Sequence, residues 1–126
     1  MFRLFERPGK KSVGERGEDL AARHLRRRGC RVLKRNYASP LGEMDIIARD
    51  GEVLVVVEVK TRASDDFGGP LAAVDVRKQR KLAQVAQCYL KQHRLGEVPC
   101  RFDVVGVTLV EGKEPVIEHI RDAFTL

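Results

Sequence analysis

The chain has 126 residues, of which 43% are hydrophobic and 33% are charged, as in an ordinary soluble protein with one hydrophobic core. Its apolar runs fall short of the roughly 20 residues that a membrane-spanning helix needs. The apolar run in its first residues is too short for a signal peptide. We therefore expect a cytoplasmic protein without a membrane partner, built as one domain over 12–126 that follows a flexible basic arm over 1–11.

The net charge of +6 is unevenly distributed along the chain. Residues 1–35 contain 12 lysines and arginines against 4 acidic residues, whereas residues 36–126 contain 12 against 14. A basic segment of this kind predicts a polyanionic partner, nucleic acid before membrane. The alternative is an arginine-rich helix face that only contacts solvent. The cysteines and histidines have neither the spacing of a zinc site nor that of a catalytic triad.

The first helix is expected to begin after Ser12 and to end near Gly29. Ser12 and Glu15 have the spacing of a capping box, and glycine is a common helix stop. The apolar residues share one side of the helical wheel and the arginines the other. Glu18 falls at the margin of the apolar side, where its carboxylate can look over the edge of the core into a site. The alternative for Glu18 is a solvated helix glutamate. Two glycines just before it would let the helix approach a sheet closely.

Three strands are predicted next, over 31–37, 43–48 and 52–61. An Asp-Gly pair at 50–51 is a strong hairpin signal between the second and the third. The third strand contains the run VLVVV at 53–57, and apolar residues at consecutive positions indicate a strand that is covered on both faces. Glu58 and Lys60 follow this run at once. They are two residues apart and therefore share one face of the strand.

The hairpin predicts a geometry for the acidic residues. A two-residue loop at the Asp-Gly pair would place Asp45 opposite Val56 and Glu43 opposite Glu58. Asp45 and Glu58 then become diagonal neighbours on one face, roughly 7–8 Å apart at the backbone. Two carboxylates at that spacing can bind one divalent cation with metal–oxygen distances of about 2.1 Å. Glu43 would lie close enough to support them.

This constellation fits phosphodiester hydrolysis, which needs a cation to neutralise the phosphate and to acidify water. Hard oxygen ligands favour Mg²⁺ or Mn²⁺ over zinc. We expect Asp45 and Glu58 to hold the ion. Lys60 would orient the attacking water and stabilise the developing charge. Glu18 would hold a water or a second ion from the side of the helix.

The second half of the chain adds basic residues near this strand. Residues 62–71 are expected to form a loop and residues 75–93 an amphipathic helix. Asp75 can cap that helix, and free amides beside cations at a helix start form a natural phosphate site. The alternative is a helix with a basic, exposed end. The predicted nucleic-acid contacts are Arg62, Arg77, Lys78, Arg80 and Lys81. Two further strands are expected over 101–110 and 115–120, and Asp103 in the first of them fits structural hydrogen bonding better than catalysis.

These residues resemble the PD-(D/E)xK superfamily of restriction-endonuclease-like nucleases in their order of helix acid, Asp and Glu-x-Lys. The chain is more closely similar to the small bacterial YraN family, to which archaeal Holliday-junction resolvases are related in structure. The blocks that carry this resemblance are GEMDII at 42–47, VEVKTR at 57–62, RFDVV at 101–105 and HIRDAF at 119–124. The resemblance spans 12–124, with Met44 where the superfamily name has proline.

The resemblance implies an α/β (α+β) fold with a restriction-endonuclease-like core in the order αβββαβ, whose mixed sheet is flanked by helices. It implies that Glu18 is the helix acid, Asp45 the second acid, and Glu58 with Lys60 the Glu-x-Lys pair. It further implies cleavage of DNA, including branched or damaged forms, to leave a 5′-phosphate. A symmetric homodimer is expected if the likeness to resolvases extends to assembly.

Three functions remain open at this point. The first is a Mg²⁺-dependent nuclease acting on DNA, favoured by the intact Asp45, Glu58 and Lys60. The second is a nucleic-acid-binding module on the same fold that does not cleave. The third is a structural or partner-binding domain, in which the charged strand face is an internal ion-pair network.

Overall fold

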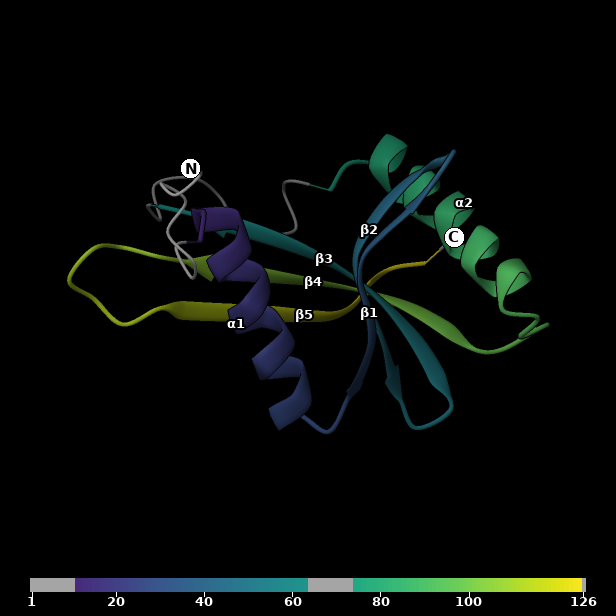
Figure 1. Ribbon diagram of the computed structural model, residues 1–126, viewed down its shortest axis with the longest axis horizontal. Helices are drawn as coiled ribbons and strands as arrows, with labels where there is room; N and C mark the ends of the chain where they lie inside the picture. The colour runs from purple at the N-terminus through teal and green to yellow at the C-terminus, as the bar shows by residue number, and fades with distance from the viewer. Residues whose placement is uncertain (1–10, 64–73, 126) are drawn as a thin grey trace, which may run out of the picture.

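The computed structural model describes residues 11–63 and 74–125 of the chain, which form two helices and one five-stranded sheet (Figure 1). In chain order the elements are α1 Val13–Arg27, β1 Arg31–Ser39, β2 Gly42–Asp50, β3 Val53–Arg62, α2 Val76–Gln92, β4 Cys100–Thr108 and β5 Val116–Phe124. The predicted basic arm, except for its last residue, lies outside the described residues, as does most of the predicted loop over 62–71.

The strands lie in the sheet in sequence order, from β1 to β5. Neighbouring strands are antiparallel except for β3 and β4, which are parallel. Helix α2 connects these two strands, as a parallel pair requires a crossover. The sheet is therefore mixed, and the predicted α+β order αβββαβ is confirmed, with β5 added at its end. Neither of the described helices has the length and apolar character needed to cross a membrane.

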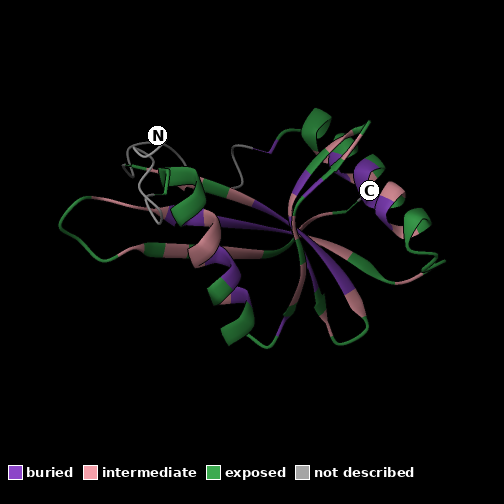
Figure 2. Ribbon diagram, in the orientation of Figure 1, coloured by how far each residue is buried: buried purple, intermediate pink, exposed green. Residues whose placement is uncertain are grey.

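Helices α1 and α2 cover opposite faces of the twisted sheet (Figure 1), and each face has its own apolar cluster. The prediction that β3 is covered on both faces is confirmed. Leu54 and Val56 belong to the cluster beneath α2, whereas Val55 and Val57 belong to the cluster beneath α1. Figure 2 shows the buried residues running along the middle strands of the sheet. Each of these four side chains is at most 3% exposed, so β3 is the central element of the core.

Local signals set the ends of both helices. Ser12 and Glu15 form the predicted capping box at α1, and Asp75 accepts a hydrogen bond from the amide of Lys78 at the start of α2. Helix α1 also contacts β3 closely at Gly17. A Cβ atom on this glycine would lie 1.9 Å from Oγ1 of Thr61. The absence of a side chain at Gly17 therefore sets how near α1 lies to the strand that carries Glu-x-Lys.

The predicted hairpin register is wrong by one residue on each strand. The turn consists of Gly51 and Glu52, and the ladder closes with Asp50 opposite Val53. Asp50 stays in the strand because its carboxylate is paired with Arg101 on β4, 2.8 Å away. The register pairs Ile46 with Val57, where the predicted register would have paired Asp45 with Val56, and the regular ladder ends at this pair, before Asp45 and Glu58. Glu43 is correspondingly displaced from the position opposite Glu58 that we expected.

The last strand is longer than the sequence predicts, running to Phe124 instead of ending at residue 120. Phe124 lies opposite Phe102 of β4, and their rings stack with centroids 4.9 Å apart. This aromatic contact explains why the strand continues past a residue with a positive φ, Asp122.

Candidate functional site

The two strand acids meet where β2 and β3 part. Regular pairing between these strands ends at Ile46 and Val57, and beyond it Oδ2 of Asp45 accepts a hydrogen bond from the amide of Val59 at 2.8 Å. The side chain of Asp45 thus replaces a backbone acceptor of the ladder. Along β2 the alternation of faces also breaks at this residue, because Met44 packs beneath α2 and Ile46 beneath α1.

Asp45 and Glu58 are close enough for a side-chain hydrogen bond between their carboxyl groups. Burial, and then the negative charge of Glu58, raises the pKa of Asp45 to about 6. Glu58 itself is only 7% exposed. Among the residues that the structure describes, Asp103 is the other buried charged residue. The site therefore brings two acidic groups together, the buried Glu58 and the half-buried Asp45.

Lys78 compensates part of this charge. Its ammonium group, in the first turn of α2, forms an ion pair with the carboxylate of Glu58. The Lys78 side chain is 47% exposed, whereas that of Glu58 is 9% exposed. The hydrogen bond to Glu58 raises the pKa of Lys78 above its ordinary value, because it favours the charged form. Lys78 therefore reaches from the surface to a nearly buried acid.

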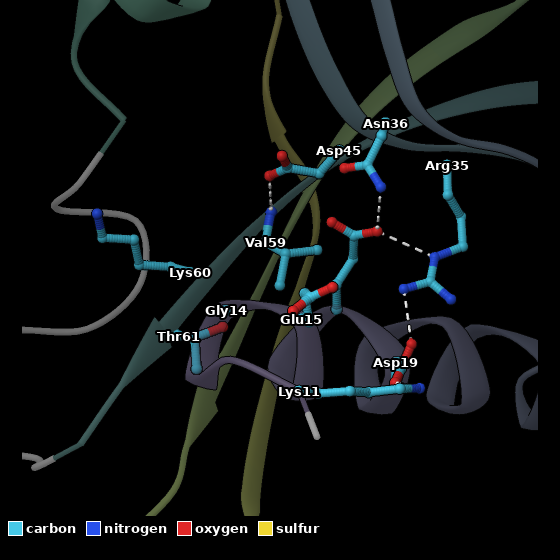
Figure 3. Close-up of a pocket in the computed structure, with 11 residues that line it drawn as sticks. Lys11, Gly14, Glu15, Asp19, Arg35, Asn36, Asp45, Val59, Lys60 and Thr61 are labelled. Atoms are coloured by element: carbon cyan, nitrogen blue, oxygen red, sulfur yellow. Dashed lines mark hydrogen bonds and ion pairs between the residues drawn. The ribbon is translucent and has the colours of Figure 1, made fainter. Parts of the chain in front are cut away.

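A pocket of about 440 Å³ opens between α1, β1 and β3, next to Asp45 (Figure 3). Glu18 lines it from α1, and its Oε1 accepts hydrogen bonds from Arg35 at 3.0 Å and from Asn36 at 3.1 Å. Arg35 also bonds to Asp19 at 2.7 Å, so one guanidinium holds two neighbouring acids of the helix. Glu18 thus faces the same pocket as Asp45, with its side chain oriented by β1.

The remaining predicted residues lie in two places, at this pocket and around the start of α2. Lys60 is exposed, lines the same pocket, and stands on the side of Asp45 opposite to Arg35 in Figure 3. Glu43 is exposed and lines a separate hollow of about 540 Å³ at the start of α2. That hollow also contains Asp75, Arg77, Lys78 and Lys81, whereas Arg62 ends β3 and Arg80 is exposed on α2. The structure therefore brings Glu18, Asp45 and Lys60 to one pocket and places Glu43 elsewhere.

The donor set is consistent with a hard divalent cation. Within the part of the chain that the structure describes, no three Asp, Glu, His or Cys side chains converge as a ready-made metal cluster. Asp45 and Glu58 nevertheless lie near enough for the charge of Glu58 to raise the pKa of Asp45, and carboxylate oxygens are what Mg²⁺ and Mn²⁺ prefer. One or two carboxylates completed by water and substrate phosphates are a usual site for Mg²⁺. These two residues thus fit the cation that the sequence predicts.

A second polar cluster lies beneath the far end of α1 and is built around Asp103, which is 1% exposed. Asp103 accepts hydrogen bonds from Arg101 at 3.0 Å and from the amide of Asp122 at 3.0 Å, and it bonds to His119 at 2.8 Å. His119 in turn contacts His24 of α1 at 3.1 Å. Although burial acts against it, the bonds from His119 and Arg101 keep the pKa of Asp103 below its ordinary value. The cluster joins α1, β4 and β5, as structural hydrogen bonding predicts.

Three features of the site were missed from the sequence. The sequence pattern indicates only a strand at Arg35 and Asn36, and the contact of Lys78 with Glu58 joins residues that are 20 positions apart. Asn36 has a φ of +53°, a backbone conformation that asparagine adopts more readily than most residues. An asparagine within a strand pattern was therefore the one local signal in the sequence that Asn36 has an unusual backbone conformation.

Comparison with known proteins places these residues in a wide set of relatives. The family described as "Uncharacterised protein family UPF0102" matches residues 17–107, which include all four residues of the predicted catalytic set. The chain is 44% identical to a UPF0102 protein of Geotalea uraniireducens (strain Rf4) over 99% of this chain and 98% of the relative. It is 46% identical to a UPF0102 protein of Geobacter sulfurreducens over 92% and 91% of the two chains.

The likeness extends to a UPF0102 protein of Rhodococcus opacus (strain B4), which is 44% identical over 90% of this chain and 96% of the relative. Both the family match and the near-complete coverage of each relative agree with the resemblance drawn from the sequence blocks. The chain therefore belongs to the UPF0102 family, also known as the YraN family.

Proposed function

We propose that this protein is a nuclease that hydrolyses phosphodiester bonds of DNA with the help of Mg²⁺ or Mn²⁺. The observation that carries the proposal is the approach of two carboxyl groups, the half-buried Asp45 and the buried Glu58, where Asp45 lines a pocket together with Glu18 and Lys60. Placing two like charges close together is unfavourable by itself. A bound cation would offset this repulsion, and perturbed acidic groups of this kind are typical of functional sites.

The residues of the chain have separate tasks in this proposal. Asp45 and Glu58 would hold the cation, which when bound supplies charge neutralisation at the phosphate and acidifies water. Lys60, exposed at the rim of the pocket, would orient the attacking water and stabilise charge on the phosphate oxygens. Glu18, fixed by Arg35 and Asn36, would hold a water at the opposite wall.

The basic residues around the start of α2 would contact the DNA backbone. Arg77, Lys78 and Lys81 line one hollow there, and Arg80 is exposed on the same helix. Arg62 lies at the end of β3, on the strand that carries Lys60. Contacts of this kind position a duplex without reading its sequence. They leave the form of the DNA to be decided by experiment.

The test is a cleavage assay with the full chain. Supercoiled, linear and four-way-junction DNA are incubated with Mg²⁺ or Mn²⁺ and wild-type protein, Asp45→Asn or Lys60→Ala. Lys113→Ala, which removes an exposed lysine in the turn before β5, serves as the matched control. We expect wild type and the control to cut at least one substrate and the two site variants to lose activity at least 100-fold, or about 3 kcal/mol in barrier. Equal cutting by all four proteins would reject the site, and no cutting at all would reject the nuclease.

A second function, DNA binding without cleavage, is favoured by one observation. The ion pair between Lys78 and Glu58 already neutralises one of the two predicted metal ligands. A protein that only binds DNA would shift its mobility in a gel, lose that binding as salt rises, and cut none of the three substrates. The same samples used in the cleavage assay therefore distinguish the two functions.

A further inference from the structure

Lys78 occupies a position that its helix alone would disfavour. It lies in the first turn of α2, whose amide groups carry partial positive charge, and the acidic residue at this helix start is the cap Asp75, which precedes the turn. Cations near a helix N-terminus are unfavourable by a few tenths to about 1 kcal/mol. The amide of Lys78 donates to the cap Asp75 at 2.9 Å, which fixes the position of its backbone.

The positive charge of Lys78 is balanced by a carboxylate on another element of the fold. Its ammonium is paired with Glu58, which is 20 residues earlier on β3, on the face of the sheet that α2 covers. Glu58 is nearly buried and lies beside a second acid, Asp45. An unpaired carboxylate in such surroundings would be costly, so the ammonium takes the role of a counter-ion. It does so at one of the two side chains assigned to the cation.

We propose that Lys78 is an internal competitor for the divalent cation, holding Glu58 until the cation binds and then turning to the phosphate backbone. This inference rests on the proposed function, because it requires Asp45 and Glu58 to be the cation ligands. The side chain of Lys78 is 47% exposed, so it can leave Glu58 without opening the core. The hollow that it also lines with Arg77 and Lys81 is the basic surface to which it would turn.

The competition predicts an effect on affinity opposite to that of an ordinary site residue. Removing the ammonium leaves Glu58 available and the local charge more negative, so the cation should bind more tightly. A half-exposed ion pair is partly screened by solvent, and we expect a gain of about three- to tenfold. Lys78→Met keeps the aliphatic stem of the side chain, whereas Lys78→Arg keeps the charge and the ion pair.

The experiment is a titration of the metal-free full chain with Mn²⁺, in which electron paramagnetic resonance measures the free ion. Lys78→Met should bind Mn²⁺ about three- to tenfold more tightly than wild type, and Lys78→Arg should bind like wild type. The matched control is Lys91→Met, which removes an exposed lysine about 20 Å further along α2 and should leave the affinity unchanged. Circular dichroism confirms that each variant is folded.

The remaining outcomes separate this inference from the proposed function. If wild type binds Mn²⁺, Asp45→Asn abolishes binding and Lys78→Met binds no more tightly than wild type, the competition is refuted and the cation site stands. If Lys78→Met and Lys91→Met bind more tightly to the same extent, the effect is one of overall charge and the competition is again refuted. If neither wild type nor Lys78→Met binds Mn²⁺, both proposals fail.

Discussion

Replacing Asp45 by asparagine should stabilise the metal-free protein at neutral pH. The asparagine side chain can still accept from the amide of Val59 and can donate to Glu58, so both hydrogen bonds are retained. What is lost is a negative charge that burial and Glu58 disfavour. The perturbation thus removes the electrostatic cost of the site and little else.

The magnitude follows from the pKa of Asp45, which is raised from 3.8 to about 6. Because the folded-state value is the higher one, the folded protein binds this proton more tightly than the unfolded chain does. Its contribution to stability is therefore fully present below pH 3.8 and is lost as pH rises through about 6. At about 1.4 kcal/mol for each pKa unit, the loss at pH 7.5 is at most about 3 kcal/mol.

The assay is urea unfolding in the presence of a chelator at pH 7.5 and at pH 4. The free energy of unfolding of Asp45→Asn should exceed that of wild type by about 1–3 kcal/mol at pH 7.5 and by less than about 1 kcal/mol at pH 4. Asp50→Asn serves as the control of opposite sign, because the hydrogen bond from Arg101 lowers the pKa of Asp50 and its carboxylate favours folding at neutral pH. Two results would refute an electrostatic cost at Asp45. One is a difference in free energy of unfolding between Asp45→Asn and wild type that does not change with pH, and the other is a variant less stable than wild type at pH 7.5.

Three further predictions concern the fold and the basic surface. Gly17→Ala should lower the free energy of unfolding by about 1–3 kcal/mol, because its Cβ overlaps β3, whereas Gly14→Ala, where the nearest atom is 3.9 Å away, should raise it by about 0.5–1 kcal/mol in the same urea assay. Asp103→Asn should cost about 3–5 kcal/mol in thermal or urea unfolding, since it removes a buried carboxylate from the guanidinium of Arg101, whose side chain is 12% exposed, and a loss below 1 kcal/mol would contradict the contacts described above. Arg77→Gln with Arg80→Gln should reduce the slope of log affinity for DNA against log salt by about 1–2 in a fluorescence titration, and an unchanged slope would remove both from the DNA contacts.

Local signals explain what could be predicted from the sequence. The ends of α1 depend on Ser12 and Glu15, which interact with neighbouring amides, and on Gly29, which has a φ of +90° just past the helix. The central strand followed from five consecutive apolar residues, because only a strand covered on both faces places all of them away from water. In both cases the controlling interactions are either within a few residues or depend on burial alone.

The parts that could not be predicted depend on contacts distant in sequence. The hairpin turn consists of Gly51 and Glu52 because Arg101, 51 residues after Asp50, holds Asp50 in the strand. Asp45 lies beyond the last regular pair of β2 and β3, so its nearness to Glu58 depends on the local hydrogen bond to Val59 and not on the register of the hairpin. The partner of Glu58, by contrast, depends on how α2 packs against the sheet, which no periodicity in the sequence reveals.

The central claim is that Asp45 and Glu58 bind one divalent cation together. The most direct measurement is an anomalous difference map from a crystal of the full chain soaked in Mn²⁺. We expect one peak about 2.1–2.2 Å from an oxygen of each carboxylate, and the electron density of the same crystal should show the ammonium of Lys78 no longer on Glu58. A map with no peak between the two carboxylates would contradict it.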